Sequence, residues 1–351
     1  MCGLTAHRGF ESRSLRQTVQ DIADPAALTL GHAEDILASG TTIALQKSFF
    51  RSAGGGYDRI TPNMDDRLPA DVALVRRLIE SQFPQWTCLD IRPVEAQGWD
   101  HHTFRLGDEM KVRLPSAARY ASQPGKEHQW LPHLARHLRL AVPQPVAIGA
   151  PGLHWPWVWS VQRWLPGDPL TLATEAIARD LGAFLRDLWA TPTADGPEAD
   201  AHSFHRGGRL QVYDDQTRSA IQAAGERVDL AMAIWTAALA AQGPAESVWV
   251  HGDLAAGNLL LNQGRLSAVI DWGLCAVGDP ACDLVPAWTI FDTSARAVFR
   301  DSLEAEPKLW LRARGWALWK SLIVLAAGEG GAQVTHARRT LDALMSDAIL
   351  Q

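Results

Sequence analysis

The sequence predicts an α+β fold in which a small antiparallel sheet comes first and a larger, mainly helical part follows. Between residues 91 and 114, three short strand candidates alternate with turn residues. From residue 174 onward, apolar residues recur mostly at helical spacing. The exception is a predicted β-hairpin near residue 260, which is flanked by polar residues. The fold class therefore follows from the order of the elements, with strand patterns first and helical spacing after them. The polar residues beside the hairpin mark a candidate site.

Residues 1 to about 60 differ from the rest of the chain. They contain polar stretches, three consecutive glycines at 54–56 and only a weak helical pattern from Ala26 to Leu37. We expect this segment to be peripheral or disordered. The first convincing helix has Val72, Val75 and Ile79 on one face.

The sheet is expected from strands at residues 91–96, 103–106 and 110–114, with turns at 97–100 and 107–108. Lys111 and Arg113 should point to the same face, because the side-chain period of a strand is two. A following helix begins near Glu127, and we expect Pro132 to interrupt it. The apolar run at 157–165 then predicts another strand, which ends at Pro166-Gly167.

Three longer helices are predicted in the second part of the chain. The first is capped by Thr174 and ends near Pro192, the second spans about 228–241, and the third spans about 307–327. The apolar residues of the third helix, which include Trp316 and Trp319, are expected in the core.

The predicted hairpin joins strands at 259–261 and 266–270 through a turn at 262–265. A hairpin returns the chain to its starting end, so Asn258 and Asp271 should lie side by side. An amide oxygen and a carboxylate are ligands that suit Mg²⁺. Asp253 precedes the hairpin in a loop, where it is free to orient a substrate hydroxyl.

Three motifs carry a resemblance to a known family. They read HGDLAAGN at 251–258, IDWG at 270–273 and GDPACDL at 278–284. The first two resemble the catalytic loop and metal-binding Asp of the protein-kinase-like fold. All three together resemble the aminoglycoside phosphotransferase-like family of small-molecule kinases. The resemblance implies a two-lobe fold, with a nucleotide-binding lobe at 64–165, a catalytic and acceptor-binding lobe at 166–351, and an extension at 1–63.

The resemblance also implies roles for individual residues. Asp253 would be the catalytic base, Asn258 and Asp271 the metal ligands, and Asp283 a buttress of the catalytic loop. Arg113 is the favoured phosphate-binding residue, with Lys111 as the alternative. The other nucleotide-site residues implied by the resemblance are Glu127 as the partner of Arg113, Gly98 in the covering loop, Gln162 at the rear of the base pocket, and the Arg163 carbonyl and Leu165 amide on the base edge.

The expected reaction moves the γ-phosphoryl group of ATP to a hydroxyl of a small molecule with the help of Mg²⁺; GTP is not excluded. An aminoglycoside-type antibiotic is the leading acceptor class. A macrolide and an ordinary metabolite, such as an amino alcohol or a sugar, are the alternatives. An alternative from another class is a catalytically silent nucleotide-binding module. Gly252 stands where regulated protein kinases carry Arg, which favours a small-molecule kinase.

Composition and charge argue against some classes of partner and location. The 351-residue chain has a net charge of −6 and no basic stripe, which argues against nucleic acid as a partner. We expect a cytoplasmic protein, because the sequence has no membrane-span candidate and no secretory signal. The four cysteines lack metal-site spacing, and the oligomeric state is open.

Overall fold

The sheet of the N-terminal part is antiparallel throughout and has the strand order β1-β2-β3-β5-β4. The computed structural model describes residues 66–95, 98–244, 246–326 and 331–347. The strands are β1 (Ile91–Pro93), β2 (His101–Leu106), β3 (Met110–Pro115), β4 (Pro145–Gly149) and β5 (Trp159–Arg163). The expected first strand thus ends at Pro93 rather than at residue 96. The weak helix expected at 26–37 lies outside the described residues.

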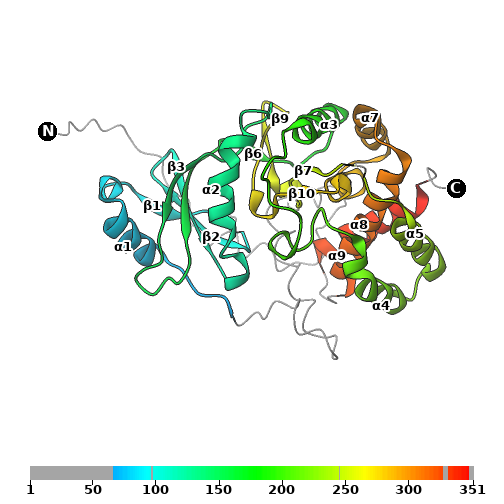
Figure 1. Cartoon of the computed structure of the whole chain (residues 1–351), viewed down its shortest axis with the longest axis horizontal. Coiled ribbons are helices and arrows are strands. Elements are labelled where there is room, and N and C mark those ends of the chain that lie inside the picture. The colour runs from blue at the N-terminus through cyan, green and yellow to red at the C-terminus, as the bar shows by residue number, and fades with distance from the viewer. Residues whose placement is uncertain (1–65, 96–97, 245, 327–330, 348–351) are drawn as a thin grey trace, which may run out of the picture. The chain divides into compact units, whose positions relative to one another are not determined.

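Two helices accompany this sheet (Figure 1). Helix α1 (Val72–Gln82) is capped by Asp71, whose Oδ1 accepts the Leu74 amide at 2.7 Å. Its buried face packs with the apolar side chains of β2, β3 and β5 in one core cluster. Helix α2 (Gln123–Leu134) contacts β3, β4 and β5. One face of the sheet is therefore apolar, while the side chains at alternate positions are free for polar contacts.

The expectation that Pro132 interrupts this helix is wrong. Helix α2 continues through Pro132 to Leu134, and the Ala135 amide still donates to the Leu131 carbonyl at 2.9 Å. Proline lacks an amide hydrogen, but a proline in the last helical turn removes one hydrogen bond without a further turn to distort. Because the helix begins at Gln123, Glu127 lies inside it, and its side chain is fully buried.

The second part of the chain is mainly helical and has its own core cluster. Its helices are α3 (Glu175–Ala190), α4 (Asp214–Ala224), α5 (Val228–Ala240), α6 (Pro286–Thr289), α7 (Thr293–Leu303), α8 (Pro307–Ala326) and α9 (Ala332–Ser346). Helix α8 packs against α4, α5 and α9, and most of its residues are buried. No helix in the described ranges is long and apolar enough to cross a membrane.

Short strands flank the segment at residues 251–258 within this helical part. The pair β7 (Val248–Val250) and β10 (Ala276–Gly278) is antiparallel, and a second sheet has the order β6-β8-β9. Its members are β6 (Asp168–Pro169), β8 (Leu259–Asn262) and β9 (Arg265–Val269). The hairpin β8-β9 confirms the predicted one. Its turn residues Gln263 and Gly264 both have positive φ, the geometry of a tight two-residue hairpin turn.

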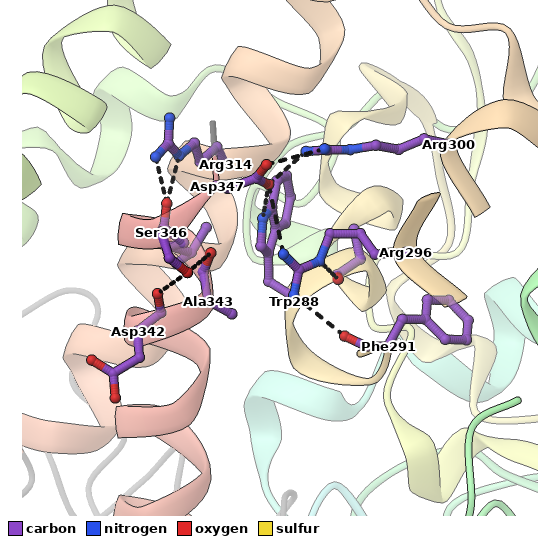
Figure 2. Close-up of polar contacts among 11 residues, drawn as sticks. Trp288, Phe291, Arg296, Arg300, Arg314, Asp342, Ala343, Ser346 and Asp347 are labelled. Carbon is purple, nitrogen blue, oxygen red and sulfur yellow. Dashed lines mark hydrogen bonds and ion pairs between the residues drawn. The ribbon is translucent and has the colours of Figure 1, made fainter. Parts of the chain in front are cut away.

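A buried polar cluster fixes the C-terminal helix to the rest of this part (Figure 2). The Asp347 carboxylate accepts from the Trp288 indole at 2.7 Å and from Arg300 at 2.7 Å, and it lies 3.9 Å from Arg296. Arg314 of α8 donates to the Leu344 carbonyl of α9. Helices α6, α7, α8 and α9 are thus joined by hydrogen bonds as well as by packing.

Candidate active site

A buried carboxylate holds the start of the segment at residues 251–258, where the first motif lies. Asp283 has no solvent exposure, and its two oxygens accept the backbone amides of His251 at 2.6 Å and Gly252 at 2.8 Å. Gly252 has φ +84°, and a Cβ there would lie 2.9 Å from the Leu274 carbonyl oxygen. This position therefore needs glycine for both its backbone angle and its close packing. Burial raises the pKa of Asp283, although His251 and the two amides oppose that effect.

His251 ties this loop to the end of β9. One ring nitrogen lies 3.0 Å from the Ile270 carbonyl, and the other lies 3.2 Å from the Asp253 amide. The ring also packs edge-on against Trp272. The position of Asp253 is thus set by contacts to the hairpin rather than by the loop alone.

The hairpin brings the two expected metal ligands to one end. The Ile270 amide donates to the Asn258 carbonyl at 2.9 Å, so Asp271 follows directly beside Asn258. The Asn258 side-chain amide donates to the Asp253 carbonyl at 2.8 Å, which turns its oxygen away from that contact. Asp271 has φ +67°, an uncommon backbone angle for a residue other than glycine. Asp253, Asn258 and Asp271 are therefore brought together.

Arg113 connects the sheet with this hairpin. Its guanidinium donates to both carboxylate oxygens of Glu127, at 2.5 and 2.6 Å, and to Asp271 Oδ1 at 2.6 Å. His101 Nδ1 lies 3.2 Å away. Burial works to lower the pKa of Arg113, but the two carboxylates outweigh burial and hold it above its ordinary value. The contact expected between Arg113 and Glu127 is present, and the additional contact with Asp271 was not expected.

Lys111 shares the inner face of β3 with Arg113. Its residue surface is 8% exposed, and no hydrogen bond or ion pair of its ammonium is found among the described residues. Burial, followed by repulsion from Arg113, lowers the pKa of Lys111 to about 8. The strand therefore presents one paired and one unpaired cation.

Two of the other residues predicted for the nucleotide site, Gln162 and Arg163, lie on β5, which pairs with β3. The Gln162 amide donates to Glu127 at 2.8 Å, while its buried oxygen has no partner in the described ranges. Arg163 follows at the end of β5, and Leu165 lies just beyond the strand. Gly98 lies in the loop before β2, and this loop is fixed to the end of β3 because Ser116 donates to the Trp99 carbonyl at 2.7 Å.

Two residues beside Asp253 were missed in the sequence. Lys320 of α8 donates to Asp253 Oδ1 at 2.9 Å, and Arg206 lines the same small pocket. Burial would raise the pKa of Asp253, but Lys320 and Arg206 outweigh burial and lower it. The available signal for Lys320 was a single charged residue within the apolar stretch from Trp316 to Ala326. Arg206 lies in an irregular segment and gave no signal.

Asp279 of the third motif has a structural role. Its Oδ1 accepts the Ala281 amide at 3.0 Å, and its Oδ2 accepts from Arg312 of α8 at 2.6 Å. It joins the segment after the hairpin to the central helix and has no contact with Asp253 or Asp271 among the described residues.

Comparisons with known proteins show the family and the fold of this chain. Residues 90–317 match the family described as the phosphotransferase enzyme family. The search of curated proteins returned no match.

Three solved structures illustrate the likeness of fold. The GDP complex of wild-type aminoglycoside 2'-phosphotransferase-IIIa is 18% identical with a TM-score of 0.60, and the match covers 79% of this chain and 99% of that one. Macrolide 2'-phosphotransferase MphH from Brachybacterium faecium is 25% identical with a TM-score of 0.53, covering 80% and 99%. The streptomycin-ATP ternary complex of APH(2")-IIa is 16% identical with a TM-score of 0.51, covering 73% and 90%.

Proposed function

Because the chain belongs to the phosphotransferase enzyme family, we propose that it transfers the γ-phosphoryl group of ATP to a hydroxyl group of a small molecule. The observation that carries this proposal is the placement of Asp253. Its carboxylate lies in a loop fixed by His251 and Asp283, next to the hairpin end that bears Asn258 and Asp271. Such an arrangement suits phosphoryl transfer, in which positioning and electrostatics supply most of the catalysis.

In the proposed step the acceptor oxygen attacks the γ-phosphorus, and the bond from that phosphorus to the bridging oxygen breaks. ADP leaves with the electron pair of the broken bond. The hydroxyl proton passes to the Asp253 carboxylate, which is kept ionised by its low pKa.

Asn258 and Asp271 are the residues that would hold Mg²⁺. Their donor set fits the ion, because Mg²⁺ prefers one or two carboxylates and completes its coordination with phosphate oxygens and water. The Asn258 amide nitrogen is already engaged, which leaves its oxygen for a ligand. Bound there, Mg²⁺ would neutralise charge that develops on the phosphates. The chain's own part is to fix these two oxygens through the hairpin and through the contact of Arg113 with Asp271.

The nucleotide is proposed to lie between the sheet and the hairpin. Arg113, held by Glu127, would contact the phosphates, and Lys111 would add a second positive charge nearby. Gly98 would belong to the loop that covers the phosphates. The Arg163 carbonyl and the Leu165 amide would bind the base edge in front of Gln162. Solved relatives of the fold contain GDP or ATP, so ATP is proposed and GTP remains an alternative.

The acceptor is a small molecule, and its class is the open part of the proposal. The solved structures similar in fold include kinases named for aminoglycosides and for macrolides. The expected aminoglycoside-type acceptor and a macrolide are thus candidates by likeness of fold, and an ordinary metabolite is the further alternative. The charges next to Asp253 distinguish among them.

The proposal is tested with Asp253→Ala. We expect ADP release with an acceptor to fall about a hundredfold or more, because the proton acceptor is lost. Nucleotide affinity, measured by calorimetry, should stay nearly unchanged. Asp342→Ala, on the exposed face of α9, is the control and should retain full activity. Retained turnover in Asp253→Ala would remove the proposed base. Nucleotide binding without turnover in the unsubstituted protein, tested against aminoglycosides, macrolides and metabolites, would favour the silent module.

A further inference from the structure

We propose that the acceptor carries an anionic oxygen group, a carboxylate or a phosphate, in addition to its hydroxyl, and that Arg206 and Lys320 bind this group beside Asp253. This inference rests on the proposed phosphotransferase function and names the substrate class of the same site.

Arg206 is a buried cation, and no counter-ion contacts it among the residues that the structure describes. It is 4% exposed, and its guanidinium carbon lies 4.2 Å from the ring centroid of Trp319 and 5.3 Å from that of Trp316. No hydrogen bond from its guanidinium is found among the described residues, and its Nη1 atom is buried. Aromatic rings compensate only part of the cost of burying a charge, so an added hydrogen-bond acceptor at this guanidinium would be favourable.

Lys320 approaches the same place from α8. Its ammonium donates to Asp253 Oδ1 at 2.9 Å, and its side chain is 19% exposed. A pocket of about 10 Å³ is lined by both cations, by Trp316 and Trp319, and by residues 252–254 of the catalytic loop. Among the described residues of that lining, Asp253 is the one carboxylate. Two positive charges therefore face one negative charge at the point where the acceptor hydroxyl must arrive.

This charge balance disfavours a polycationic acceptor. Aminoglycosides would need several carboxylates near Asp253, and two acidic residues of this part of the chain, Asp214 and Asp292, are engaged elsewhere. Asp214 accepts from Arg218 and from the Trp235 indole, and Asp292 caps α7 through the Ala295 amide. An ammonium group beside Lys320 would meet a like charge, which costs binding free energy.

An anionic acceptor meets the opposite situation. One carboxylate or phosphate can accept from Arg206, which the tryptophan rings hold in place, and from Lys320. Such an anion would also share Lys320 with Asp253. Charge-assisted hydrogen bonds of this kind are stronger than neutral ones and fix orientation. The hydroxyl of the bound acceptor is then kept close to Asp253.

The first test measures ADP release by the full chain with Mg²⁺ and ATP. The acceptors are a broad metabolite extract separated by ion exchange into anionic, neutral and cationic fractions, with kanamycin and a macrolide tested separately.

The proposal expects the highest turnover in the anionic fraction. Mass spectrometry of the phosphorylated product shows whether the acceptor carries a carboxylate or a phosphate. Highest turnover with kanamycin, a macrolide, or the neutral or cationic fraction would overturn it, as would no turnover in the anionic fraction. A separate measurement of ATP binding distinguishes the two proposals. If the protein shows neither turnover nor ATP binding, the phosphotransferase function itself is contradicted, and not only the anionic acceptor.

The second test uses matched variants. Arg206→Gln and Lys320→Met should each raise the acceptor KM by about tenfold to a hundredfold, the effect of losing one charge-assisted hydrogen bond. Lys320→Arg should restore most of the affinity, because it keeps the charge.

The controls are Arg209→Gln and Lys308→Met, at two exposed positions. Lys308 lies on the same helix as Lys320, and both control variants should keep the original acceptor KM. If Arg206→Gln does not fold, the Lys320 series decides alone. A lower kcat at unchanged acceptor KM, or a higher KM for ATP instead, would overturn the proposal.

Discussion

At the residue scale, Arg113 has two functions that a sequence pattern cannot separate. It pairs with Glu127 as the family pattern implies, and it also fixes Asp271. Both contacts are possible because the guanidinium presents several donors in a fixed plane, whereas a lysine would offer a single charged nitrogen. We infer that the same side chain would help to place phosphates and a metal ligand.

Glu127→Gln tests the buried pair. Removing one partner leaves Arg113 partly uncompensated in the interior, so unfolding should become easier by about 3 kcal/mol. Chemical denaturation measures this change. The control is Glu109→Gln, whose exposed pair with Arg163 at 2.8 Å should contribute less than about 1 kcal/mol. Equal effects of the two substitutions would mean that the buried Glu127 pair contributes no more to the free energy of unfolding than the exposed pair.

Lys111 should make nucleotide affinity depend on pH, with weaker binding at higher pH. Its pKa is lowered to about 8 chiefly by burial, so the ammonium is charged below that pH and neutral above it. Affinity for ADP should therefore weaken severalfold between about pH 7 and about pH 9, because a positive charge near the phosphates is lost. Calorimetry of ADP binding measures the profile. Lys111→Met should flatten it, and an identical profile in both proteins would exclude Lys111 from the nucleotide site.

At the scale of elements, the hairpin β8-β9 shows how local chemistry determines a site. Its turn needs two residues with positive φ, and Gln263-Gly264 supplies them. That register pairs Leu259 with Val269, so the residues just outside the strands, Asn258 and Asp271, come to the same end. A turn that is set by neighbouring residues can be read from sequence, which is why this part of the site was predictable.

Gly264→Ala tests the turn. Alanine at φ +73° should destabilise the protein by about 1 to 2 kcal/mol, because its Cβ disfavours the left-handed region. The control is Gly125→Ala in α2, where no atom lies within 4 Å of the added Cβ. There the substitution should be neutral or stabilising by up to about 1 kcal/mol. Denaturation midpoints compare the two, and equal midpoints would show that the turn angle carries no strain.

At the scale of the whole molecule, two apolar clusters organise the described part of the chain. One joins α1 with the five-stranded sheet, and the other surrounds α8. The buried polar contacts of Asp347 add a specific anchor for the last helix, where Trp288, Arg296 and Arg300 converge on one carboxylate (Figure 2). Helix α8 also carries Lys320, so its packing sets the position of a charge in the site.

Asp347→Asn tests this anchor. The substitution leaves two partly buried arginines without their carboxylate, so the unfolding temperature should drop by roughly 5 °C or more. Asp342→Asn lies one turn away on α9 with an exposed partner, Arg227, and should change little. Thermal unfolding followed by circular dichroism measures both. If Asp342→Asn lowered the unfolding temperature as much as Asp347→Asn does, the contacts of Asp347 would have no specific role in anchoring the helix.

The sequence by itself determined the α+β order of elements, the family, and the residues of the hairpin site. These depend on periodicity, turn chemistry and motif spacing, all of which act over a few residues. Only the tertiary structure decided that Arg113 reaches Asp271 across 158 positions and that Lys320 reaches Asp253 across 67. It also decided that Arg206 is buried against Trp316 and Trp319. The physical reason is that such contacts depend on how separate elements pack, and no local pattern encodes which buried charge will face which carboxylate.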